Sequence, residues 1–230
     1  MIYRDLTRRQ QLQRLWDIED IKKLVHKRVI YIANNWRERE LDELWTKEHA
    51  GEATFGSNTG YYTSMDSIRR WYTAGDRSVG YLTHHPVSTD LVEVAKDGKT
   101  ARGLWYSIGQ ETVPGKAMWV SGKIAVDFIK EEDAWKILHV VESNDVTCGA
   151  GEDYGAGEVY WDPAADPIAQ AFGRPDVEKI THDPNFNWWD NYPAMPEPYD
   201  TWNDRESYAP AGYNPTPFKG LNAKEGGNYR

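Results

Sequence analysis

The stretch from Thr83 to Gly109 constrains the fold most, because it has the pattern of two strands joined by a tight turn. Residues 91–95 and 101–106 are rich in β-branched and apolar side chains, and Asp97-Gly98 lies between them. An Asp-Gly pair in this setting is typical of a β-hairpin, since glycine adopts the positive φ angle that the turn needs. The stretch therefore predicts a rigid hairpin that begins just after two histidines.

His84 and His85 are those histidines. An imidazole titrates near neutral pH and can transfer protons, so the pair is a candidate catalytic site. The alternative is structural: one histidine faces solvent and the other ends a strand. Their place before a predicted hairpin favours the catalytic interpretation.

The rest of the first 148 residues predicts helices followed by strands. Apolar residues recur at steps of three and four in residues 5–35, the pattern of an amphipathic helix. A short helix is expected at residues 36–45, and a third helix after Ser64 as N-cap residue. Strands follow at residues 116–130 and 135–141. This order predicts an α+β domain with helices packed on one face of an antiparallel sheet.

The composition changes near Cys148. Ten of the twelve prolines lie in residues 149–230, and no apolar period persists there. Disordered segments are poor in aromatic residues, whereas this segment is not. We therefore expect a domain at residues 1–148 and an ordered C-terminal arm at residues 149–230, which packs on its own domain or on a neighbouring subunit. Its candidate contact residues are Trp161, Phe172, Phe186, Trp188, Trp189 and Trp202.

Bulk properties exclude several classes of function. The net charge of −9 disfavours nucleic acid and anionic membranes as partners. The single cysteine rules out an intramolecular disulfide framework, and no apolar run approaches the roughly 20 residues of a membrane span. No glycine-rich phosphate loop is present, and we expect no cofactor. These features predict a soluble, cytoplasmic protein, and eleven Trp and fourteen Tyr suggest an aromatic-lined cavity.

Metal binding is the weaker alternative for the histidines. The six histidines show no HxH or HExxH spacing, and adjacent histidines on a strand point to opposite faces. A site made of His85, His139 and Asp127 stays open as an alternative. We expect no metal.

Several strings, taken in order, resemble the SnoaL-like branch of the nuclear transport factor 2-like superfamily. They are the helix that ends near Tyr31, the histidine before the hairpin, residues 92–101, and residues 126–128 leading into 135–137. The resemblance covers roughly residues 15–145. It implies a curved antiparallel sheet wrapped around the N-terminal helices as a cone with a deep pocket, and often a homodimer or higher homo-oligomer. The superfamily includes dehydratases, steroid isomerases and polyketide cyclases that need no redox cofactor.

The resemblance also implies site residues. His85 fits the position of the family's general base, with His84 one residue away, and Tyr31 lies near the family's helical tyrosine. The carboxylate expected at the helix end is missing, because the sequence there is Ala33-Asn34-Asn35-Trp36. Asparagine can hold a hydrogen bond but cannot stabilise an imidazolium with a negative charge.

Strand alternation supplies further candidates. Asp127 shares a face with Lys123, opposite Ile124 and Phe128, and is a substitute for the missing carboxylate. His139 is expected to share a face with Ile137. Substrate-binding candidates are Asn34, Trp105, Trp119, Lys123 and His139.

The sequence thus predicts a cofactor-independent lyase, such as a dehydratase, or an isomerase that acts by acid/base chemistry on a small apolar or aromatic ring compound. His85 would remove a proton, and Tyr31, Lys123 or Asn34 would stabilise the oxygen that gains charge. The alternative is a ligand-binding or assembly protein of the same fold without chemistry.

Overall fold

The computed structural model describes residue 3 and residues 5–57, 60–74, 79–152, 173–178, 193–204 and 207–209. Three helices occur in this part of the chain: α1 (Arg8–Ala33), α2 (Arg37–Leu44) and α3 (Met65–Thr73). The expected long helix is therefore a single continuous α1. Ser64 caps α3 as expected, because its side chain accepts a hydrogen bond from the Ser67 amide. None of these helices is both long and apolar enough to cross a membrane.

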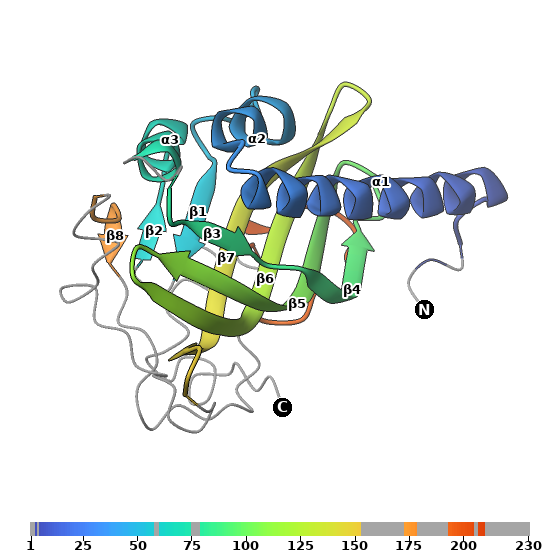
Figure 1. Ribbon diagram of the computed structural model, residues 1–230. Coiled ribbons are helices and arrows are strands. Elements are labelled where there is room, and N and C mark those ends of the chain that lie inside the picture. The colour runs from blue at the N-terminus through green and yellow to red at the C-terminus, as the bar shows by residue number, and fades with distance from the viewer. Residues whose placement is uncertain are drawn as a thin grey trace, which may run out of the picture.

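The strands of the described residues form one curved sheet in the order β3-β5-β6-β7-β1-β2-β8, with β4 also paired to β5 (Figure 1). β1 and β7 run parallel, and the other strand pairs are antiparallel. The sheet and its N-terminal helices give the α+β architecture that the sequence predicts. The strands are β1 (Thr54–Ser57), β2 (Gly60–Tyr62), β3 (Leu82–His84), β4 (Val87–Val94), β5 (Thr100–Val113), β6 (Lys116–Glu131), β7 (Ala134–Gly149) and β8 (Val177–Glu178).

The predicted central hairpin is confirmed. Val94 of β4 faces Ala101 of β5, and Gly98 in the turn has a φ of 71°. A side chain at that φ would be strained, which explains the glycine. The two strands are thereby fixed relative to each other, and β3 with His84 pairs to the far end of β5.

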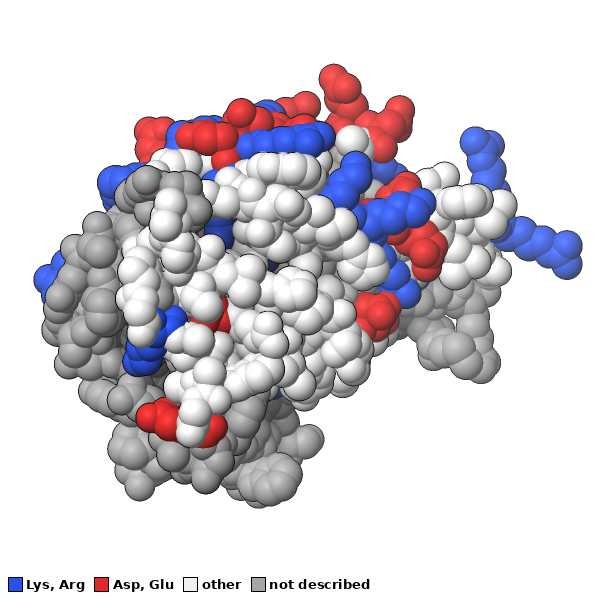
Figure 2. Space-filling view, viewed as in Figure 1, with Lys and Arg blue, Asp and Glu red and all other residues white. Residues whose placement is uncertain are grey.

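Helix α1 lies across one face of the sheet (Figure 1). Its buried stripe, which includes Ile21, Leu24 and Val25, packs in one core cluster with Trp105 and Phe128 from the strands. The polar faces of the helices point to solvent: Figure 2 shows charged side chains gathered over α1 and α2, above a mostly uncharged middle. The core therefore lies between the helices and the inner face of the sheet.

A β-bulge changes which residues of β7 face the core. The register of β6 and β7 shifts between Asp127 and Phe128, so that Asp127 faces His139 while Phe128 faces Ile137. Trp135 and Ile137 belong to the inner core, but His139 lies on the outer face. The expectation that Ile137 and His139 share a face is wrong, because an extra residue in one strand reverses the alternation beyond it.

The described residues of the C-terminal arm between 193 and 209 lie on the outer face of the same chain's sheet, whereas β8 extends the edge of the sheet beside β2. Tyr208 packs with Leu104, Ala125 and Val141, and its amide donates to Asp127 Oδ2 at 2.6 Å. The hydroxyl groups of Tyr199 and Thr100 form a hydrogen bond of 3.0 Å. Trp202 lies beside the His139 ring, 5.8 Å between centroids. The other five aromatic candidates of the arm lie outside the described residues.

We expect truncation after Gly149 to lower the melting temperature of the protein. The cut removes the cover of Leu104, Ala125 and Val141, and each large apolar side chain that is fully uncovered costs about 1.5–3 kcal/mol. It also takes the Tyr208 amide from the buried Asp127 carboxylate. Thermal unfolding with a dye for exposed apolar surface measures the effect. A truncated chain that melts with the full-length protein and binds no dye would show that the arm adds no stability.

Candidate active site

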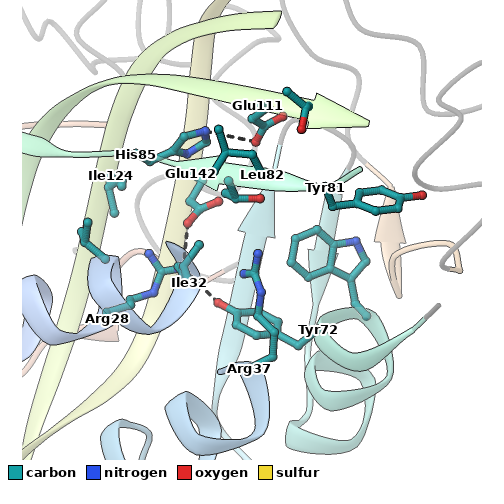
Figure 3. A pocket seen from close by; sticks show the side chains of 14 residues that line it. Arg28, Ile32, Arg37, Tyr72, Tyr81, Leu82, His85, Glu111, Ile124 and Glu142 are labelled. Atoms are coloured by element: carbon teal, nitrogen blue, oxygen red, sulfur yellow. Dashed lines mark hydrogen bonds and ion pairs between the residues drawn. The ribbon is translucent and has the colours of Figure 1, made fainter. Parts of the chain in front are cut away.

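A cavity lies between α1, α3 and the inner face of the sheet, close to the start of α2 (Figure 3). Its walls combine aromatic and aliphatic side chains with a few charged groups, the composition of small-molecule sites. The charged groups come from separate elements of the fold and converge on one space. The lining residues are Arg28, Val29, Ile32, Arg37, Trp71, Tyr72, Tyr81, Leu82, Thr83, His85, Glu111, Thr112, Ile124 and Glu142.

Arg28 holds one wall of the cavity together. It extends the buried stripe of α1 and is 2% exposed. Its guanidinium donates to Glu40 Oε1 at 3.0 Å, to Glu142 Oε1 at 2.6 Å and to the Tyr72 hydroxyl oxygen at 2.9 Å. Burial alone would raise the pKa of Glu142, but the charges of Arg28 and His85 outweigh burial and lower it. Glu142 is therefore an ionised carboxylate in the cavity wall.

His85 follows β3 and faces the cavity from the opposite side. Its Nε2 atom lies 3.1 Å from Glu111 Oε1 on β5, off the direction of a good hydrogen bond. Burial lowers the pKa of His85, but the close contact with the Glu111 carboxylate and the charges of Glu111 and Glu142 outweigh burial and raise it. The imidazolium form is thus stabilised by two carboxylates.

Gly109 makes room for the His85 ring. A Cβ atom at this position would lie 2.2 Å from His85 Cδ2 and 2.8 Å from the His84 carbonyl oxygen. His84, the last residue of β3, is exposed and does not line the cavity. The two histidines therefore have different surroundings, and only His85 can contact a molecule in the cavity.

Tyr31 and Asn34 lie at the end of α1, away from the cavity lining. The Tyr31 hydroxyl donates to Glu43 Oε2 at 2.6 Å, on the side of α2. Asn34 is exposed at the helix C-cap, and its amide donates to the Ile30 carbonyl oxygen at 2.8 Å. The structure does not bring either side chain to His85.

Asp127, His139 and Lys123 lie on the outer face of the sheet, opposite Ile124. Asp127 Oδ2 is 2.9 Å from His139 Nδ1, and Lys123 is 3.6 Å from Asp145. The alternative metal site of His85, His139 and Asp127 is therefore wrong, because the sheet separates them. Among the residues that the structure describes, no group of three His, Cys, Asp or Glu side chains is placed to hold a metal ion.

The two tryptophans proposed as pocket walls lie elsewhere. Trp105 is 1% exposed in the inner core, edge-on to Phe128 at 6.2 Å. Trp119 is half-buried on β6, opposite Cys148 of β7. The aromatic walls are instead Trp71, Tyr72 and Tyr81. Of the nine residues proposed from the sequence, the structure places His85 in the cavity.

The site residues that the sequence analysis missed carried signals of different strength. Arg28 stands on the apolar stripe of α1, four residues after Leu24 and four before Ile32, and a cation there indicates a buried ion pair. Glu111 shares a strand face with Gly109, which an alternation count can find. Glu142 faces inward only because of the bulge, so no local signal predicts it.

A curved sheet with N-terminal helices on one face and a cavity between them is the architecture of the nuclear transport factor 2-like proteins. Residues 13–141 match the family model of the SnoaL-like domain, more than half of the chain. The chain therefore belongs to the SnoaL-like family. No curated protein matches its sequence.

Solved structures of this superfamily superpose on the chain at low identity. Hexachlorocyclohexane dehydrochlorinase LinA type 3 from Novosphingobium barchaimii is 12% identical, with a TM-score of 0.53, over 63% of this chain and 97% of that one. A proposed scytalone dehydratase from Novosphingobium aromaticivorans is 11% identical, with a TM-score of 0.52, over 61% and 92%. A nuclear transport factor 2-like protein from Salmonella enterica is 16% identical, with a TM-score of 0.50, over 60% and 97%. These likenesses establish the fold.

Proposed function

We propose that the protein is a cofactor-independent lyase or isomerase that acts by acid/base chemistry on a small, largely apolar ring compound. One observation carries the proposal. The His85 imidazole lies beside two carboxylates, Glu111 and Glu142, and lines a cavity with Trp71, Tyr72 and Tyr81. Aromatic walls stack on a flat ring, and a tuned histidine can move a proton on it.

His85 acts first as a general base. Its neutral imidazole takes a proton from a carbon next to a carbonyl or phenol, and becomes an imidazolium. The charges of Glu111 and Glu142 stabilise this imidazolium, as their effect on its pKa indicates. The imidazolium then returns the proton, to a leaving group in a lyase or to another carbon in an isomerase.

Tyr72 is suited to stabilise the oxygen that gains negative charge. Its oxygen accepts a hydrogen bond from Arg28, which leaves the phenol hydrogen free to donate. Burial, with the charges of Glu40 and Glu142, raises its pKa far above the ordinary value, so it stays a protonated donor. This role replaces the one expected of Tyr31, Lys123 or Asn34.

The superfamily relatives support the reaction class. A dehydrochlorinase removes hydrogen chloride and a dehydratase removes water, and both reactions take a proton from the substrate. The family position for a helix-borne carboxylate holds no Asp or Glu in this chain. In our proposal Glu111 on β5 and Glu142 on β7 supply that charge from the sheet.

Proton removal can be tested before the product is known. The full-length protein is incubated in deuterium oxide with a panel of ring ketones and phenols, and NMR follows deuterium incorporation at carbon. We expect catalysed exchange on at least one ring compound, but not on open-chain ketones. Binding of ring compounds without any exchange would contradict the proposed enzymatic function and indicate a ligand-binding protein.

A further inference from the structure

Arg37 is a cation that lines the cavity and forms no ion pair with a described carboxylate. It is the first residue of α2 and lines the cavity together with His85. Figure 3 shows its side chain directed into the cavity beside Tyr72. Its Nε atom is buried and has no hydrogen-bond partner among the described residues. Its guanidinium carbon lies 5.7 Å from the centroid of the Tyr72 ring.

The other charged groups of the cavity have partners. Arg28 pairs with Glu40 and Glu142, and His85 with Glu111. The charge of Arg37 contributes to lowering the pKa of Glu142, but in the described part of the chain Arg37 forms no ion pair. The Nη donors of its planar guanidinium, which form no hydrogen bond or ion pair with the described residues, are therefore available to a molecule in the cavity.

We propose that Arg37 binds the carboxylate of the substrate, so that the substrates are small ring compounds that carry a carboxyl group. The planar guanidinium matches a carboxylate with two parallel hydrogen bonds, and a donor left unpaired in a buried site is costly. The ring of the same compound lies against Trp71, Tyr72 and Tyr81. This inference rests on the proposed function, because it takes the cavity to be a site for ring compounds.

A structural pairing is the rival explanation. Glu40 stands three residues after Arg37 on α2, and its Oε2 atom is also buried without a partner. A rotation of Arg37 would join the two side chains. However, Glu40 is 0% exposed and its Oε1 atom already receives Arg28, whereas Arg37 reaches the cavity. The geometry therefore favours ligand binding by Arg37 over a structural ion pair with Glu40.

Calorimetric titration of the full-length protein with benzoate and with uncharged benzamide tests the inference. The two probes share ring and size, so their difference reports the charge. We expect benzoate to bind about 10-fold or more tightly than benzamide. Arg37→Gln should abolish this preference and leave benzamide binding unchanged. Arg39→Gln is the matched control, because Arg39 lies on the same helix, pairs with Glu43 and does not line the cavity.

Each other outcome overturns the inference in a distinct way. Equal binding of benzoate and benzamide would show that the cavity does not select a carboxylate, and would leave the ring site of the proposed function intact. If Arg37→Gln still prefers benzoate but melts at a lower temperature, Arg37 instead forms a structural ion pair with Glu40. Absence of binding by both probes would count against the inference and against the ring site together.

Discussion

Replacement of His85 by alanine is expected to slow deuterium exchange by about 10²–10⁴-fold, the usual loss when a general base is removed. The fold should persist, because the side chain lines a cavity and is 15% exposed. The measurement is the exchange rate on a compound that the unmodified protein exchanges, with the melting temperature as a check on folding.

His84→Ala is the matched control. His84 differs from His85 by one position, ends β3 and is exposed. Its removal should change the exchange rate less than about threefold, since it neither lines the cavity nor faces the two carboxylates. Full exchange by His85→Ala, or an equal loss in both variants, would remove His85 from the role of base.

Arg28→Ala is expected to destabilise the protein by about 3–5 kcal/mol, the cost of breaking a buried ion pair from one side. The variant leaves the Glu40 and Glu142 carboxylates in the wall without their cation. Urea unfolding at pH 7 measures the loss. Arg39→Ala is the control, because its exposed i,i+4 pair with Glu43 should contribute at most about 1 kcal/mol.

The same variant should respond to pH in a defined direction. Burial already raises the pKa of Glu40 in the unmodified protein, and without the charge of Arg28 we expect the pKa of Glu40 to rise further and that of Glu142 to rise as well. Protonation then favours the folded state, so the free energy of unfolding of Arg28→Ala should increase as the pH falls from 7 to 5. In the unmodified protein Arg28 helps to lower the pKa of Glu142, so its contribution to stability is lost as the pH falls through that pKa. Equal losses of stability in Arg28→Ala and Arg39→Ala would contradict the stabilising role of the Arg28 ion pairs with Glu40 and Glu142.

The elements of the fold follow from local patterns in the sequence. The three-and-four spacing of apolar residues gives α1, Ser64 gives the start of α3, and Asp97-Gly98 gives the hairpin turn. Each signal acts within a few residues, so neighbouring side chains suffice to predict it. The family resemblance adds how these elements assemble, and it also leads to His85.

The partners of His85 could not be read in the same way. Each helical residue turns by about 100°, so Tyr31 faces α2 while Arg28 and Ile32 face the cavity. On the strands, Asp127 lies outside by simple alternation from Phe128, but the extra residue of β7 opposite this pair places His139 outside and Glu142 inside. Both outcomes depend on how distant segments pack, which a local pattern does not contain.

The most direct test of the central claim, that His85 is a tuned acid/base group open to the cavity, is an NMR titration of its imidazole. We predict a midpoint above the value of about 6.5 for an unperturbed histidine, because Glu111 and Glu142 raise the pKa of His85. In Glu111→Gln the midpoint should fall, since burial then acts with less opposition. Benzamide should shift the signal of His85 but not that of His84. A His85 midpoint below about 6.5 that neither Glu111→Gln nor benzamide changes would contradict the account.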